Sequence, residues 1–148
     1  MHRILLTRLA AAMLAVPLLF TSALADTPSK MLTILASENT ETQAMALVLS
    51  NQTAKAGVPV HLLLCGPAGD IALATAPAAA TKVVTPKGMT VRTLLEALMA
   101  KGATVDVCAI YLPNRKLPQT ALLKGVGVAK PPVIAAEMAN LKTKLAIY

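Results

Sequence analysis

Strand-like and helix-like segments alternate along this chain, and the alternation limits the folds that it can adopt. Three continuous apolar runs are typical of strands buried on both faces; they are 31–36 (MLTILA), 58–65 (VPVHLLLC) and 103–110 (ATVDVCAI). Apolar residues at helical spacing occupy 41–56 and 91–101, between these runs. Strands joined through helices pair in parallel with right-handed crossovers. The sequence therefore predicts a three-layer α/β/α sandwich around a mostly parallel sheet.

The C-terminal part of the chain is predicted to bring the sheet to five strands. We expect a short strand at 125–129 (GVGVA), a helix that begins at Pro131 and runs to about Asn140, and a last strand at 141–148. A loop with a short helix is expected at 113–123. The alternation is not interrupted by a linker or an internal repeat, so it indicates one domain.

Polar residues that precede the helical segments are predicted to cap them. Thr40 and Thr90 each stand before a segment with helical spacing. Asp70 is expected to cap a short helix that follows it. Pro77 interrupts any helix nearby, so we expect 72–80 to form a surface excursion.

The first 25 residues have the pattern of a secretory signal peptide. Two arginines begin it, an apolar stretch follows at 9–20, and Ala-Leu-Ala at 23–25 is a typical cleavage site. The alternative is a membrane anchor, but the apolar stretch is shorter than the roughly 20 residues that a spanning helix needs. We therefore expect residues 1–25 to be a cleaved signal peptide and residues 26–148 to be the mature domain.

Export of this kind predicts a periplasmic protein. No second apolar stretch of membrane-spanning length follows in the sequence, so we expect no stable membrane anchor after cleavage. The periplasm is oxidising, so both cysteines of the chain would meet disulfide chemistry there.

The scarcity of aromatic and histidine residues excludes several kinds of site. The aromatic residues are Phe20, Tyr111 and Tyr148, too few for a surface that stacks nucleic-acid bases, and we expect no nucleic-acid partner. His61 is the one histidine after the leader, so a metal cage built of histidines is not expected, and inside a strand it is predicted to be a satisfied core histidine. The chain lacks the glycine motifs that bind dinucleotides or phosphates, and we expect no cofactor.

Cys108 is the strongest candidate for a reactive group. It comes near the end of the third predicted strand, just before a loop that holds Tyr111, Asn114 and Arg115. A thiol there would be rigidly held yet reachable, and cations in the loop would favour the nucleophilic thiolate. The alternative is an inert buried cysteine, since free cysteine is among the most buried residue types.

Cys65 ends the second predicted strand in the same way. Neighbouring strands lie about 4.8 Å apart, and a disulfide needs Cα atoms about 4.4–6.8 Å apart. If the two strands are neighbours in register, Cys65 and Cys108 come within bonding distance, as a structural bond or as a redox pair. The sequence alone leaves that register open.

Most of the chain also resembles the DsrE/DsrF/TusD-like family. Its C-terminal half is similar through the helix 91–102 (VRTLLEALMAKG), the strand and loop 103–115 (ATVDVCAIYLPNR) and the segment 124–148. The segment 31–66 is similar to the first β-α-β unit of the family. The chemically specific feature of the resemblance is the cysteine at the end of the third strand.

The resemblance implies a five-stranded parallel sheet, homo-oligomers and a role in sulfur relay, as an exported member of the family. In that role Cys108 takes sulfur as a persulfide and passes it to a protein thiol, and any enzyme activity would be that of a sulfur carrier or sulfurtransferase. This chain departs from the family in its loop AIYLPNRKLP, which lacks the glycine after the basic residue, and in its leader. The alternative is a non-enzymatic oligomeric or small-ligand-binding module with a structural Cys65–Cys108 disulfide. A thiol–disulfide oxidoreductase is less favoured because the chain has no C-x-x-C motif.

Overall fold

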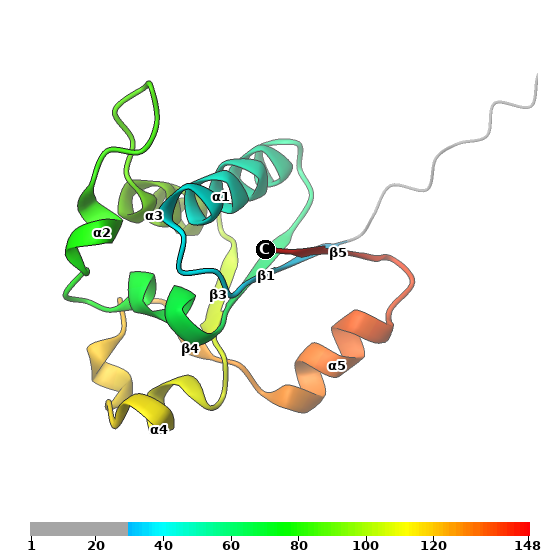
Figure 1. Cartoon of the computed structure of the whole chain (residues 1–148). Helices are drawn as coiled ribbons and strands as arrows, with labels where there is room; N and C mark the ends of the chain where they lie inside the picture. The colour runs from blue at the N-terminus through cyan, green and yellow to red at the C-terminus, as the bar shows by residue number, and fades with distance from the viewer. Residues whose placement is uncertain (1–29) are drawn as a thin grey trace, which may run out of the picture.

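The computed structural model describes residues 30–148 and contains one sheet of five parallel strands (Figure 1). The predicted signal peptide lies outside the described residues. The strand order across the sheet is β4-β3-β2-β1-β5. The strands are β1 (Lys30–Leu35), β2 (Val60–Leu64), β3 (Thr104–Val107), β4 (Gly127–Val128) and β5 (Thr143–Ile147). Every pair is parallel, so the predicted sheet is confirmed in strand number and is parallel throughout.

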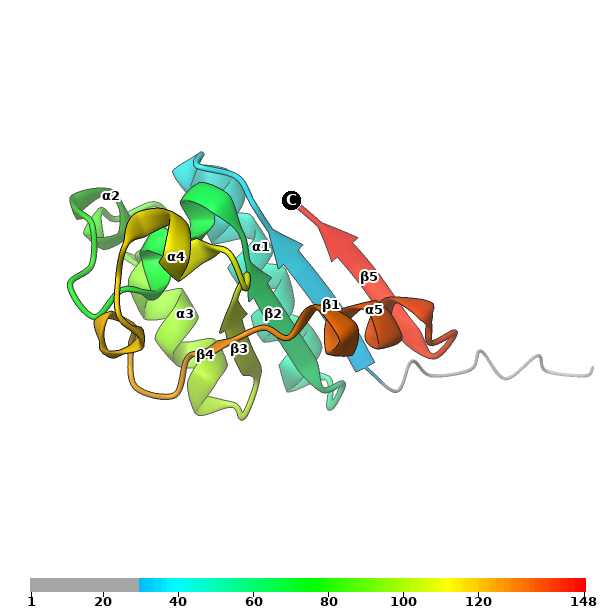
Figure 2. The ribbon, with the colours of Figure 1, turned by 90° about the horizontal axis from the view of Figure 1, so that it is seen from below.

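Helices cover both faces of the sheet, which confirms the predicted α/β/α sandwich (Figure 2). On one face α1 (Thr40–Lys55) lies beside α3 (Val91–Ala100), and on the other lies α5 (Pro131–Ala139). Shorter turns occupy the connections: η1 (Gly66–Ala72), α2 (Ala78–Thr81), α4 (Tyr111–Arg115) and η2 (Gln119–Ala121). Among residues 30–148, no helix combines the length and the apolar character needed to cross a bilayer.

The predicted caps are right at one helix and wrong at two. Thr90 caps α3 as expected, and its hydroxyl accepts from the backbone N–H of Thr93 in a capping box. For α1 the prediction is wrong, because Thr40 is already helical and Asn39 is the cap. Asp70 caps nothing, because η1 begins at Gly66 and already contains it.

The two faces of the sheet have cores of different size. The larger core lies under α1 and α3 and includes the fully buried Leu47, Leu62 and Leu95. Alternate residues of the strands point the other way, where the smaller cluster of Leu32, Leu63, Ala129 and Ile134 lies under α5. This smaller cluster is the surface against which both cysteines pack.

Ion pairs and hydrogen bonds hold α5 to its face of the sheet. His61 in β2 is 3% exposed, and its Nδ1 lies 2.9 Å from Glu137 of α5 while its Nε2 lies 3.0 Å from Asp106 of β3. Both ring nitrogens therefore lie within hydrogen-bond distance of a carboxylate oxygen. Lys30 of β1 lies 2.6 Å from the same Glu137. The prediction of a satisfied strand histidine is therefore confirmed.

The structure differs from the sequence prediction in two further places, the end of the third strand and the segment 72–80. The third strand ends at Val107 rather than at residue 110, because the chain turns after Cys108 into α4. The expected surface excursion at 72–80 is partly wrong, since Ala72 and Ala80 are buried in the larger core. Their small side chains allow this backbone to approach the layer of α3 closely.

Candidate functional site

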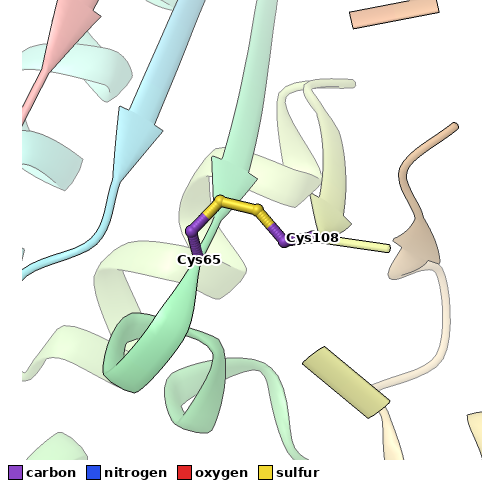
Figure 3. The surroundings of a disulfide bond; sticks show 2 residues. All are labelled: Cys65 and Cys108. Atoms are coloured by element: carbon purple, nitrogen blue, oxygen red, sulfur yellow. A yellow bond between two sulfur atoms is a disulfide. The ribbon is translucent and has the colours of Figure 1, made fainter. Parts of the chain in front are cut away.

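Cys65 and Cys108 form a disulfide across two neighbouring strands at the carboxyl edge of the sheet (Figure 3). In the pairing of β2 with β3, the last partners are Leu64 and Val107. The residue that follows each of them is a cysteine. Their Cα atoms lie 5.1 Å apart, inside the range that a disulfide needs. Strand order and register, which the sequence left open, thus bring the two residues together.

Backbone hydrogen bonds hold both cysteines in place. The N–H of Cys65 donates to the carbonyl of Leu35 at 2.9 Å, and the N–H of Cys108 donates to the carbonyl of Leu64 at 2.9 Å. The carbonyl of Cys108 in turn accepts from the N–H of Tyr111 at 2.8 Å. Both side chains are half-buried, so the sulfur atoms are fixed by the sheet without being fully enclosed.

A cavity of about 360 Å³ opens between the two segments that follow the cysteines. Its size lies at the lower end of the range for small-molecule sites, about 300–1,000 Å³. The sequence-predicted loop residues Tyr111, Asn114 and Arg115 all line it. The full set of lining residues is Gly66, Pro67, Ile110, Tyr111, Asn114 and Arg115.

Tyr111 lines this cavity and is buried, rather than being exposed in a loop. It begins α4, its side chain is 3% exposed, and its hydroxyl donates to Asp70 at 2.9 Å. Burial, together with that hydrogen bond and the negative charge of Asp70, raises the pKa of Tyr111 well above its ordinary value, although Arg115 opposes the rise. Tyr111 therefore stays protonated and acts as a donor to Asp70.

Arg115 is engaged with Asp70 as well. Its guanidinium lies 3.0 Å from the Asp70 carboxylate and 5.1 Å from the centre of the Tyr111 ring. Arg115, a cation expected to favour a thiolate, is therefore paired with Asp70, and its effect on a neighbouring thiolate is reduced. Asn114 and Arg115 lie in α4 and are both exposed at the cavity.

The sequence does not predict Asp70 as a member of this site. It was expected to be a helix cap, and it binds two residues that lie more than 40 positions along the chain. No local pattern reports a contact of that separation. The neighbouring Gly69 leaves room for the Tyr111 ring, with which a side chain at position 69 would collide, but a glycine alone does not identify that partner.

His61 takes no part in the cysteine site. It lies four residues before Cys65 on β2, about 13 Å away at the rise of a strand, and both its ring nitrogens bind carboxylates. A Cys–His catalytic pair is thereby excluded. In the part of the chain that the structure describes, no group of three His, Cys, Asp or Glu side chains is arranged to hold a metal ion.

Solved structures with this architecture include the ychN protein from E. coli. Its crystal structure matches with a TM-score of 0.65 and 17% identity, over 81% of this chain and 99% of that one. The fold is DsrE-like. The DsrE-like fold is also matched by MTH1491 from Methanobacterium thermoautotrophicum, a protein of unknown function, with a TM-score of 0.58 and 12% identity over 80% of this chain and 99% of that one.

A third DsrE-like match is BT1422 from Bacteroides thetaiotaomicron, a conserved protein of unknown function. It has a TM-score of 0.56 and 17% identity over 84% of this chain and 99% of that one. No protein-family model matches the sequence, and no curated protein matches it significantly. The similarity at these identities concerns the fold alone.

Proposed function

We propose that this protein handles sulfur in the periplasm and that its reduced form accepts a sulfane sulfur on Cys108 as a persulfide. The observation that carries the proposal is the position of Cys108. The residue follows β3 at the carboxyl edge of a DsrE-like sheet, half-buried, in bonding contact with a second cysteine. Ligands of open parallel sheets gather at this edge.

The proposed reaction is a thiolate substitution. The Cys108 thiolate attacks the outer sulfur of a low-molecular-weight persulfide, RS–SH, and the thiolate RS⁻ leaves. Cys108 then carries –S–SH, and no net oxidation or reduction has occurred. The cavity between the segments that follow the cysteines has room for a small donor, with Asn114 and Arg115 exposed along it.

The disulfide is the resting, oxidised state in this proposal. The bond must be reduced before Cys108 can accept sulfur, because only a free thiolate is nucleophilic. A signal peptide at residues 1–25 would place the protein in an oxidising compartment, where such a bond persists.

Self-association and a protein thiol that receives the sulfur are further parts of the proposal. The first is supported by exposed apolar side chains on α5, after it and on β5, among them Met138, Leu141 and Ile147, with Leu141 99% exposed. Exposed large apolar side chains are used in contacts between proteins. The second is supported by the half-exposed position of the cysteine pair, which a thiol from outside can approach.

The test uses the Cys65→Ser variant, in which Cys108 is the one remaining thiol. The reduced variant is incubated with glutathione persulfide and its mass is measured without reductant. We expect a gain of about 32 Da, the mass of one sulfur atom, located on Cys108 by peptide mapping. The double variant Cys65→Ser/Cys108→Ser is the matched control, and an unchanged mass in the single variant would refute the proposal.

A second candidate function is favoured by the bond itself. The Cys65–Cys108 disulfide could be a permanent structural bond in an oligomeric or small-ligand-binding module. Thiol counting on the exported protein separates the two: a bond that resists mild dithiol reductant in the native state supports the structural role. A bond that opens readily without unfolding supports the role in sulfur handling.

A further inference from the structure

We propose that Cys65 is a resolving thiol that expels the sulfur held on Cys108 as hydrosulfide. The inference rests on the proposed function and goes one step beyond it, because it names the fate of the sulfur. In a relay the sulfur leaves for a partner protein. Release inside the protein, with the disulfide as the product, competes with that transfer, which the proposed function also includes.

The first support is that the two sulfur atoms are placed for this attack by the sheet. β2 and β3 are hydrogen-bonded neighbours, and the cysteines occupy equivalent positions just past their ends. The Cα distance of 5.1 Å lets the bond form without movement of the backbone. A persulfide on Cys108 would therefore carry its inner sulfur within reach of the Cys65 thiolate.

The second support is that both residues share one face of the sheet. Cys65 and Cys108 pack together against the small cluster under α5, which includes Leu63 and Ile134. Side chains alternate between the faces of a strand, so a cysteine one residue earlier or later would point into the other layer. The pairing thus depends on both residues standing where they do.

The proposed step balances as a two-electron exchange. The Cys65 thiolate attacks the inner sulfur of Cys108–S–SH, the Cys65–Cys108 bond forms, the terminal sulfur bond breaks and HS⁻ leaves. The sulfane sulfur is reduced, and the two cysteine thiols are oxidised to the disulfide. An external dithiol then reduces the disulfide by exchange, which regenerates both thiols for another turnover.

Intramolecular attack favours release over relay. A tethered group acts at an effective concentration of about millimolar or higher, whereas a partner thiol competes at its own concentration. The sequence contains two cysteines, so Cys65 is the one thiol of this chain that can reach Cys108. We therefore expect release of hydrosulfide to be faster than transfer to a partner protein.

The test is a single turnover of the reduced wild-type protein with one equivalent of glutathione persulfide, after removal of excess reductant. We expect about one equivalent of hydrosulfide per chain above the protein-free control, loss of both thiols and a mass lower by two hydrogen atoms. The Cys65→Ser variant should keep the added sulfur on Cys108 and release none. The Cys108→Ser variant should neither gain sulfur nor release it.

Other outcomes overturn the inference in separable ways. If wild type and Cys65→Ser both keep a stable persulfide, Cys65 does not resolve it, and the proposed acceptor role of Cys108 stands. If Cys65→Ser gains no sulfur while its circular dichroism spectrum is unchanged, the proposed function itself fails. If Cys108→Ser accepts sulfur, the roles of the two cysteines are not those proposed here.

Discussion

Reduction of the Cys65–Cys108 bond should destabilise the protein by a measurable amount without unfolding it. The bond joins residues 43 positions apart in the chain. In the unfolded state it closes a loop of that length and removes conformational freedom that the reduced chain keeps. The folded state changes little, because the sheet already holds the two residues close together.

The magnitude follows from the loop length. For a closed loop of 43 residues, the chain-entropy relation gives about 13 cal/mol/K, which is about 4 kcal/mol at 25 °C. Domains of this size unfold with free energies of about 5–15 kcal/mol, so the reduced form should stay folded. That outcome matters for the proposed function, because only a free thiolate can accept sulfur.

Urea unfolding in the presence and absence of dithiol measures the difference. With an m-value of about 2 kcal/mol/M, the midpoint should fall by about 2 M on reduction. The double variant Cys65→Ala/Cys108→Ala is the control, and its midpoint should be the same in both conditions.

Two results would refute this reasoning. Equal midpoints for the oxidised and reduced wild type would mean that the bond does not restrict the unfolded chain. A reduced form that is unfolded in buffer would exclude a folded dithiol state, and the proposed sulfur chemistry would fall with it.

Three further changes test the packing and charges described above. Gly69→Ala should lower the unfolding free energy by about 1–3 kcal/mol, because the new methyl group meets the Tyr111 ring; an unchanged thermal midpoint would contradict this contact. Burial raises the pKa of Glu137, but the hydrogen bonds and charges of Lys30 and His61 outweigh it and leave the pKa below its ordinary value. The stability that this carboxylate contributes is thus present above the ordinary glutamate pKa and is lost as the pH falls through the folded-state pKa. Glu137→Gln should therefore flatten the acid side of a plot of the urea unfolding midpoint against pH. An unaltered plot would count against the interaction. Arg92→Leu should cost about 2 kcal/mol in chemical denaturation, because the buried guanidinium donates to three carbonyls at and after the end of η1; a fully stable variant would show these bonds to be dispensable.

The fold was predictable because local patterns report it. Continuous apolar runs and helical spacing are properties of neighbouring residues, and they gave the five strands and the helices of both layers. Segment ends were harder to predict, since Asn39 and Thr40 are both good caps and the choice depends on which of them is the first helical residue. β3 ends before the predicted residue 110 because the chain turns after Cys108 and buries the Tyr111 side chain.

The site was predictable only in part. Sequence position placed Cys65 and Cys108 at strand ends, but their bond required β2 and β3 to be neighbours in one particular register. The contact of Asp70 with Tyr111 and Arg115 joins residues far apart in sequence, so a local cap was the simplest interpretation of Asp70. Tertiary contacts of this kind follow from topology, which periodicity does not specify.

The His61–Asp106 contact has a consequence for the cysteines that follow the same two strands. A slip of β3 by one residue against β2 would turn its side chains to the opposite face of the sheet. It would also separate the His61 ring from the Asp106 carboxylate, which lie 3.0 Å apart in the structure. While the disulfide is open, this partly buried contact helps to keep the alignment of the two strands, so Cys65 and Cys108 remain opposite each other and can re-form the same bond.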